Sequence, residues 1–138
     1  LIAVAIIAIG GLAYFNTGSK MATSPPLAET ATSKPLVEVK IPSLSGSAKI
    51  GEVAFNAKCA VCHGENAAGQ DGAGPPLIHK IYEPSHHGDG AFLLAVQNGV
   101  RTHHWNFGSM PPVEGVTNGD VKAIVAYIRA VQRENGIN

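Results

Sequence analysis

Two cysteines and a histidine form the segment of this chain with the most specific chemistry, Cys59-Ala60-Val61-Cys62-His63. Two thiols three residues apart, followed at once by an imidazole, are the pattern of a c-type haem attachment site. Each thiol can add to one vinyl group of the porphyrin, and His63 can place a ring nitrogen on one axial face of the iron. The segment therefore predicts one covalently attached haem c.

Other interpretations of the same two cysteines stay open at this point. A redox-active Cys-x-x-Cys pair needs a thioredoxin-like βαβ context, whereas residues 51–58 indicate a helix with no strand pattern before it. A structural zinc site needs four ligands, and the chain has two cysteines, although its six histidines leave a mixed site conceivable. A plain disulfide or an accidental match is a further alternative. The motif favours haem over all of these.

The first fifteen residues, Leu1 to Phe15, contain no charged or strongly polar side chain. Fifteen helical residues span about 22 Å, against about 30 Å of membrane hydrocarbon, so a complete span would need residues before Leu1. No Ala-x-Ala-like cleavage site follows the apolar run, which favours an anchor over a cleaved signal peptide. We expect residues 1–18 to be a transmembrane anchor in contact with lipid, incomplete at its N-terminus.

Ser, Thr, Ala and Pro dominate residues 19–46, which show no apolar period and are typical of a linker. The domain that follows is predicted to occupy residues 47–138. Seven Lys and Arg in it face eight Asp and Glu. Because no broad basic surface can form from this balance, we expect no nucleic-acid partner.

Two helices are predicted to hold the cysteine motif. Gly51 and Phe55 lie four residues apart and share one helix face, with Cys59 one turn further on. The last helix begins at residues 117–118, and its apolar side chains recur at helical spacing. These are Val121, Ile124, Val125 and Ile128. We expect the two helices to pack with a close approach at Gly51 and with Phe55 against Tyr127.

In these features residues 47–138 resemble a class I cytochrome c. The series Gly51, Phe55, Cys59, Cys62, His63 is similar in order and spacing to the family's N-terminal helix and haem motif. The resemblance implies an all-α fold, in which N- and C-terminal helices pack around a single haem. It also implies that the iron is ligated by one histidine and one methionine.

Residues 74–77, Gly-Pro-Pro-Leu, resemble the family's Gly-Pro-x-Leu loop. In that family the proline carbonyl accepts the second N–H of the proximal histidine. The resemblance therefore implies that Pro75 orients His63 and that Leu77 contributes to the haem site.

Residues 108–112, Gly-Ser-Met-Pro-Pro, resemble the family loop that carries the distal methionine. The resemblance implies Met110 as the second axial ligand, a soft thioether that favours ferrous iron. The chain's other methionine, Met21, falls in the linker. His103 or His104, a few residues before Met110, stays open as a replacement ligand.

Arg101 and Trp105 lie shortly before Met110, and both carry donors suited to a haem propionate; for Trp105, packing on the porphyrin edge is equally open. Five histidines besides His63 exceed what a minimal cytochrome needs. A second metal at the His86-His87 and His103-His104 pairs stays open, as do surface or propionate-contacting roles.

With both axial positions filled by protein, the iron has no open site for a small-molecule substrate. We therefore expect an electron carrier and not an enzyme. The resemblance to tethered family members predicts a carrier at the bacterial inner membrane, with the haem domain in the periplasm. A bc1-type complex would be the donor, and a terminal oxidase or photosynthetic reaction centre the acceptor. Two alternatives are a fixed haem subunit of a larger respiratory or photosynthetic complex and a ligand sensor with a labile Met110.

Overall fold

Helices make up the regular structure of residues 34–138, which are the residues described by this computed structural model. The elements are α1 (Gly46–Lys58), α2 (Ala60–His63), η1 (Glu65–Ala67), η2 (Lys80–Tyr82), α3 (Asp89–Asn98) and α4 (Asn118–Glu134). Within these residues there is no β-strand, and three isolated β-bridges tie loops together. The predicted all-α class is confirmed for this part of the chain.

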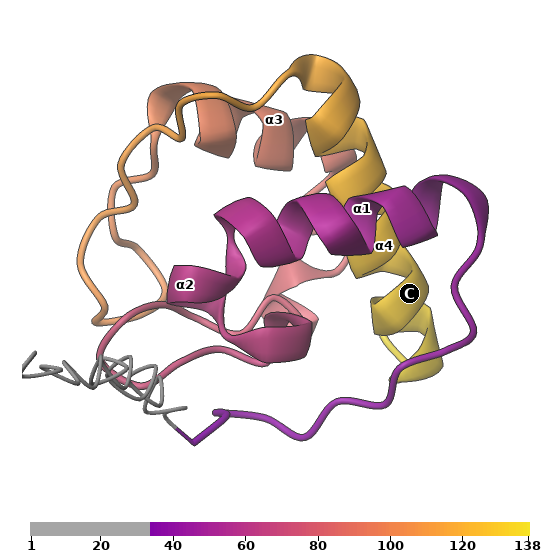
Figure 1. Ribbon diagram of the computed structural model, residues 1–138. Coiled ribbons are helices and arrows are strands. Elements are labelled where there is room, and N and C mark those ends of the chain that lie inside the picture. Colours follow the sequence, from indigo (N-terminus) through magenta and orange to yellow (C-terminus); the bar gives the residue numbers. More distant parts are fainter. Residues whose placement is uncertain (1–33) are drawn as a thin grey trace, which may run out of the picture. The chain divides into compact units, whose positions relative to one another are not determined.

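The first and last of these helices, α1 and α4, cross one another (Figure 1). At the crossing, a Cβ on Gly51 would lie 1.9 Å from the carbonyl oxygen of Ala123, so only glycine permits this approach of the two backbones. The rings of Phe55 and Tyr127 are fully buried, with their centroids 5.5 Å apart. Both predicted features of this contact are confirmed.

The helix α4 begins where the sequence predicts. The Thr117 hydroxyl accepts from the N–H of Asp120 (3.2 Å), and the Asp120 carboxylate accepts from the N–H of Thr117 (2.8 Å). This reciprocal pair is a capping box, which satisfies two N–H groups at the helix start. The hydrogen bonds from the Thr117 side chain and backbone hold the pKa of Asp120 below its usual value. All four predicted core residues of α4 are buried.

Residues 34–45 lie against the domain, although the sequence places them in the linker. The N–H groups of Leu36 and Val37 both donate to the carbonyl of Ala68, at 3.1 and 3.2 Å. Further along, Lys40 and Asn135 form two hydrogen bonds of 2.9 and 2.8 Å. This extended segment contributes single apolar side chains, so it carries no period that a sequence pattern could detect. The folded unit therefore extends beyond the predicted boundary at residue 47.

No helix in residues 34–138 combines the length and the apolar character that a membrane span requires. The predicted anchor, residues 1–18, lies outside the described residues. So do residues 19–33 of the predicted linker.

Replacing Gly51 with alanine tests the helix crossing. The added Cβ would collide with the backbone of α4, so we expect Gly51→Ala to lower the free energy of unfolding by about 2 kcal/mol or more. Guanidinium unfolding of the haem-loaded protein, followed by circular dichroism, measures this change.

The matched control is Gly90→Ala in α3, where an added Cβ meets no atom within 4 Å. We expect it to be neutral or to stabilise by up to about 1 kcal/mol, because alanine is the better helix former. Equal stability of the two variants would contradict the close approach at Gly51.

Candidate functional site

The turn that carries the cysteines lies directly after α1. The N–H of Cys59 donates to the carbonyl of Phe55 (2.7 Å), and the Cys59 carbonyl accepts from the N–H groups of Cys62 (3.1 Å) and His63 (2.9 Å). These bonds form the single turn of α2. Because residues three and four apart share one side of a helix, Cys59, Cys62 and His63 project together, and all three line one cavity.

Both thiols are free, and their environment does not match that of a redox pair. Burial, and secondarily the neighbouring Cys62, raises the pKa of Cys59 to about 11. Reactive cysteines have a lowered pKa instead, and residues 34–138 offer no βαβ context. Within the same residues, the one group of side chains that could hold a metal ion contains neither cysteine. The redox and zinc interpretations of this motif therefore lose support.

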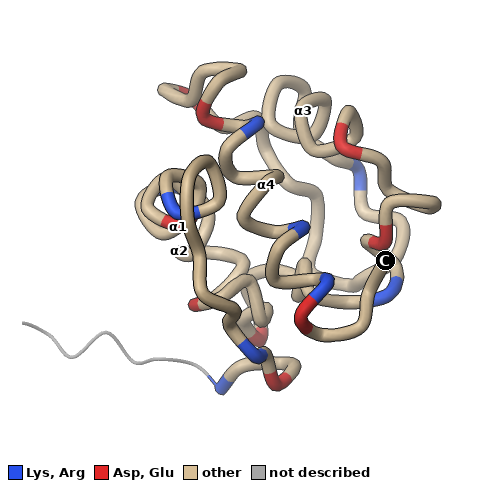
Figure 2. The backbone as a smooth tube through the Cα atoms, turned by 90° about the vertical axis from the view of Figure 1, so that its right-hand side faces the viewer, with Lys and Arg blue, Asp and Glu red and all other residues tan. Residues whose placement is uncertain are grey.

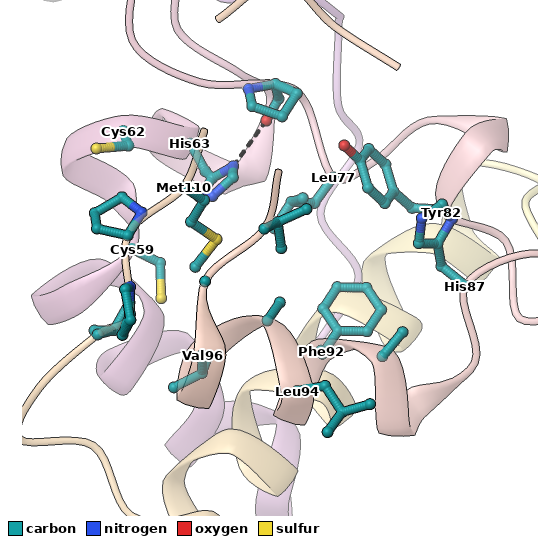
Figure 3. A pocket seen from close by; sticks show the side chains of 18 of the residues that line it. Cys59, Cys62, His63, Leu77, Tyr82, His87, Phe92, Leu94, Val96 and Met110 are labelled. Carbon is teal, nitrogen blue, oxygen red and sulfur yellow. Dashed lines mark hydrogen bonds between the residues drawn. The ribbon is translucent and has the colours of Figure 1, made fainter. Parts of the chain in front are cut away.

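His63 is held by a backbone carbonyl. Its Nδ1 donates to the carbonyl oxygen of Pro75 at 2.9 Å, the hydrogen bond that the resemblance implies (Figure 3). Because a carbonyl only accepts, Nδ1 carries the proton and Nε2 keeps the lone pair that an iron ligand needs. Burial lowers the pKa of His63, while the bond to Pro75 acts in the opposite direction. Both effects leave the ring oriented by Pro75, with Nε2 able to act as a ligand.

The loop that presents Pro75 is packed tightly on the cysteine turn. Gln70 and Gly74 exchange two backbone hydrogen bonds of 3.0 Å, which close the loop. A Cβ on Gly74 would lie 2.7 Å from the carbonyl oxygen of Cys62, so a larger residue there would push the two segments apart. The glycine therefore sets the distance between His63 and the carbonyl that orients it.

A cavity of about 640 Å³ lies between the helices and two loops. The end of α1, the turn α2 and the helices α3 and α4 contribute to its wall, together with the loops that carry Leu77 and Met110. Figure 3 shows the ring of His63 and the thioether of Met110 extending into it from different segments. Most of the other lining is apolar. It includes Phe55, Leu77, Phe92, Val96, Val100, Val121, Ile124 and Ile128.

Met110 is positioned by a short backbone ladder. Its N–H donates to the carbonyl of Val100, and the N–H of Val100 donates to the carbonyl of Met110, both at 2.9 Å. Pro111 and Pro112 follow and also line the cavity. Proline fixes the backbone φ angle, so the loop is stiff where it presents the thioether.

The three remaining predicted residues differ in their placement. Leu77 is buried and lines the cavity. Trp105 also lines it, and its indole N–H is buried without a hydrogen-bond partner. Arg101 is exposed and is not among the lining residues, so the structure does not bring it to the site; the carbonyl of Arg101 instead accepts from Nδ1 of His103 at 2.8 Å.

These residues fit a haem. The cavity offers an apolar space for the porphyrin, two thiols beside one wall, and a neutral imidazole and a soft, neutral thioether that could act as ligands. A buried N–H without a partner costs free energy, and the indole of Trp105 would gain an acceptor from a haem propionate. The two thiols, Cys59 and Cys62, would each add across a vinyl group and become thioethers when the group binds.

Of the two histidines that could replace Met110, each has one ring nitrogen directed elsewhere. Nδ1 of His103 is bound to the carbonyl of Arg101. Nε2 of His104 lies 3.3 Å from Nε2 of His86, on the neighbouring loop. Both histidines line the cavity, and each keeps its other ring nitrogen outside these two contacts.

Two buried polar residues of α4 were not predicted from the sequence. Arg129 donates from Nη1 to the carbonyl of Tyr82 (2.7 Å), from Nη2 to the carbonyl of His87, and from Nε to the carboxylate of Asp89 (2.8 Å). Gln132 donates from Nε2 to the carbonyls of Leu77 (2.9 Å) and Tyr82 (3.0 Å). The helical period could have identified Arg129 and Gln132 as buried, because residues 125, 129 and 132 share the apolar face of the helix.

Replacing Arg129 with methionine tests this support. Methionine keeps the apolar bulk but leaves the carbonyl of His87 without its Arg129 donor and that of Tyr82 with Gln132 as its remaining side-chain donor. We expect Arg129→Met to lower the free energy of unfolding by about 2–4 kcal/mol, with faster amide hydrogen exchange in residues 79–87. The control is Lys122→Met on the exposed side of α4, expected to change stability by no more than about 0.5 kcal/mol. Unchanged exchange in the loop would contradict the role of Arg129.

Comparison with known proteins agrees with this geometry. A protein-family model described as Cytochrome c matches residues 48–132. No curated protein matches the chain. The family match spans most of the described residues and includes the cysteine turn, His63, both cavity loops and nearly all of α4. Haem c, covalently attached at a motif with Cys59 and Cys62, and haem-based electron transfer follow from it. The chain belongs to the cytochrome c family.

Proposed function

We propose that this chain is a membrane-tethered electron carrier whose iron has His63 and Met110 as its two axial ligands. The observation that carries the proposal is the entry of an oriented, neutral imidazole and a thioether into one largely apolar cavity. Haem c, when bound, supplies an iron that accepts and returns one electron. With His63 and Met110 both bound to it, that iron would have no coordination position left for a substrate.

Both proposed ligands are restrained by backbone hydrogen bonds. The ring of His63 is fixed by Pro75, and the segment of Met110 is fixed by its pairing with Val100. A ligand that is held in this way moves little when the charge on the iron changes by one unit. Small movement favours electron transfer over reactions that need an open coordination site.

The cysteine turn provides a route by which an electron can pass between the haem and the protein surface. Cys62 is exposed, and the neighbouring side chain of Val61 is 75% exposed. A thioether at Cys62 would therefore lie where a docked partner can approach it. An apolar side chain at this position suits the small, transient interfaces of redox partners.

The distribution of charged residues favours a tethered carrier over one that is steered to its partners by long-range electrostatic attraction. Lys, Arg, Asp and Glu are interspersed along the described backbone in the view of Figure 2. Because a tether itself raises the effective concentration beside partners, a uniform charged surface is not required. We infer from the apolar run Leu1 to Phe15 that the chain is tethered at the bacterial inner membrane, with its haem domain in the periplasm. A bc1-type donor and an oxidase or reaction-centre acceptor fit that location.

Purification of the full chain from membranes in mild detergent tests the tethered carrier. We expect the chain to be extracted with the membrane fraction and to separate from other haem proteins, because its partners bind transiently. Recovery in a fixed stoichiometric complex would favour the alternative of a permanent haem subunit. Recovery in the soluble periplasmic fraction would contradict the tether.

Replacing Met110 with alanine tests the distal ligand. We expect Met110→Ala to lose the sulfur-to-iron charge-transfer band of the ferric protein, to lower the reduction potential, and to let the ferrous protein bind carbon monoxide at neutral pH. Absorption spectroscopy and a redox titration measure these changes. The matched control is Met21→Ala, which replaces the chain's other methionine and should leave all three properties unchanged.

The unmodified protein distinguishes the carrier from a ligand sensor. A carrier with stable ligation should bind carbon monoxide poorly in the ferrous state. Rapid binding by the unmodified protein would instead show that the distal ligand is labile. Retention of the sulfur band in Met110→Ala would contradict Met110 as the ligand.

A further inference from the structure

Four histidine side chains from two separate loops gather beside the cavity. His86 and His87 follow η2, and His103 and His104 follow Val100. Ring centroids lie 5.2 Å apart for His86 and His104, 5.3 Å for His87 and His104, and 4.3 Å for His103 and His104. Three of them, His87, His103 and His104, also line the cavity, but none is among the proposed axial ligands, so the arrangement of the four needs a separate explanation.

A tight turn allows adjacent histidines to face one centre. The N–H groups of His86 and His87 both donate to the carbonyl of Glu83, at 3.0 and 2.8 Å, so the chain turns sharply there. As a result, one ring nitrogen from each of His86, His87 and His104 lies within 4.8 Å of the other two. The adjacent residues His86 and His87 thus lie close to His104, which is 17 or more positions further along the chain.

The closest of these distances matches a metal site. Nε2 of His86 and Nε2 of His104 lie 3.3 Å apart. Two imidazole nitrogens at about 2.0–2.1 Å from a tetrahedral zinc ion are about 3.3 Å from one another. Small side-chain rotations would bring the third nitrogen, from His87, to the same distance.

Backbone carbonyls set the ring orientation as they do around bound metals. Nδ1 of His87 donates to the carbonyl of Ile81 at 2.7 Å, which leaves Nε2 with its lone pair. Nδ1 of His103 donates in the same way to the backbone carbonyl of Arg101. The loop itself is tied to α4, because Arg129 donates to the carbonyl of His87. Of the three side chains within 4.8 Å, His87 is therefore already oriented as a ligand.

We propose that His86, His87 and His104 bind one divalent transition-metal ion, with His103 or water available as a fourth ligand. Three neutral imidazoles suit zinc and copper, whereas magnesium and calcium require oxygen ligands. His87 and His104 also line the haem cavity, so the ion lies close to the haem. Its positive charge disfavours the oxidised iron and raises the reduction potential.

Calorimetric titration of the haem-loaded protein with Zn²⁺ alone tests the site. We expect one equivalent to bind, with a dissociation constant in the micromolar range or below. The double variant His86→Ala/His104→Ala removes two ligands that are exposed, so it should fold normally and bind at least about 100-fold more weakly. A redox titration should show that Zn²⁺ raises the potential of the unmodified protein and not that of the double variant.

The matched control is His79→Asn. His79 lies outside the cluster and caps η2 by accepting from the N–H of Ile81, a role that asparagine can keep. Its affinity for Zn²⁺ should stay within about twofold of the unmodified protein. Absence of binding below millimolar Zn²⁺, or equal affinity in the double variant, would overturn the site. Because calorimetry does not depend on which residue ligates the iron, either result leaves the proposed electron transfer untouched.

Discussion

The backbone contact at Gly51 fixes how α1 and α4 cross, and the haem cavity is built around that crossing. It brings the carbonyl of Ala123 to a distance that no side chain at residue 51 would tolerate. The fixed crossing aims the end of α1, and therefore Cys59, at one wall of the cavity. It also fixes α4, which supports the opposite loops through Arg129 and Gln132. One helix pair thus determines where covalent attachment and loop support occur.

Around that helix pair, the site residues are positioned mainly by hydrogen bonds to backbone carbonyls. Pro75 orients His63, Val100 pairs with Met110, and Ile81 orients His87. Carbonyls suit this task because they only accept, and so they determine which imidazole nitrogen keeps its lone pair. The same device serves the proposed haem ligand and the proposed metal cluster. A carrier built in this way can change its iron's charge with little movement of the protein.

The sequence predicted features that depend on local spacing. The motif of Cys59 to His63 and the start of the last helix at residues 117–118 follow from residue types within a few positions of each other. Phe55 and Tyr127 were identified because each lies on the apolar face of a helix. Hydrogen bonds between residues far apart in the sequence could not be predicted from local spacing. Arg129 lies more than 40 residues from the carbonyls of Tyr82 and His87 that it supports, and Arg101 was expected at the site although it faces solvent. The apolar residues of the segment 34–45 show no period, so its contacts with the domain could not be predicted either.

We propose that His63 and Met110 ligate the iron in both oxidation states. X-ray absorption at the iron edge of the haem-loaded protein measures the ligands directly, in the oxidised and in the reduced form. We expect one sulfur ligand and one imidazole nitrogen besides the four porphyrin nitrogens in each form, with nearly unchanged distances. Loss of the sulfur ligand in either form, or its replacement by a second imidazole or a water molecule, would contradict it.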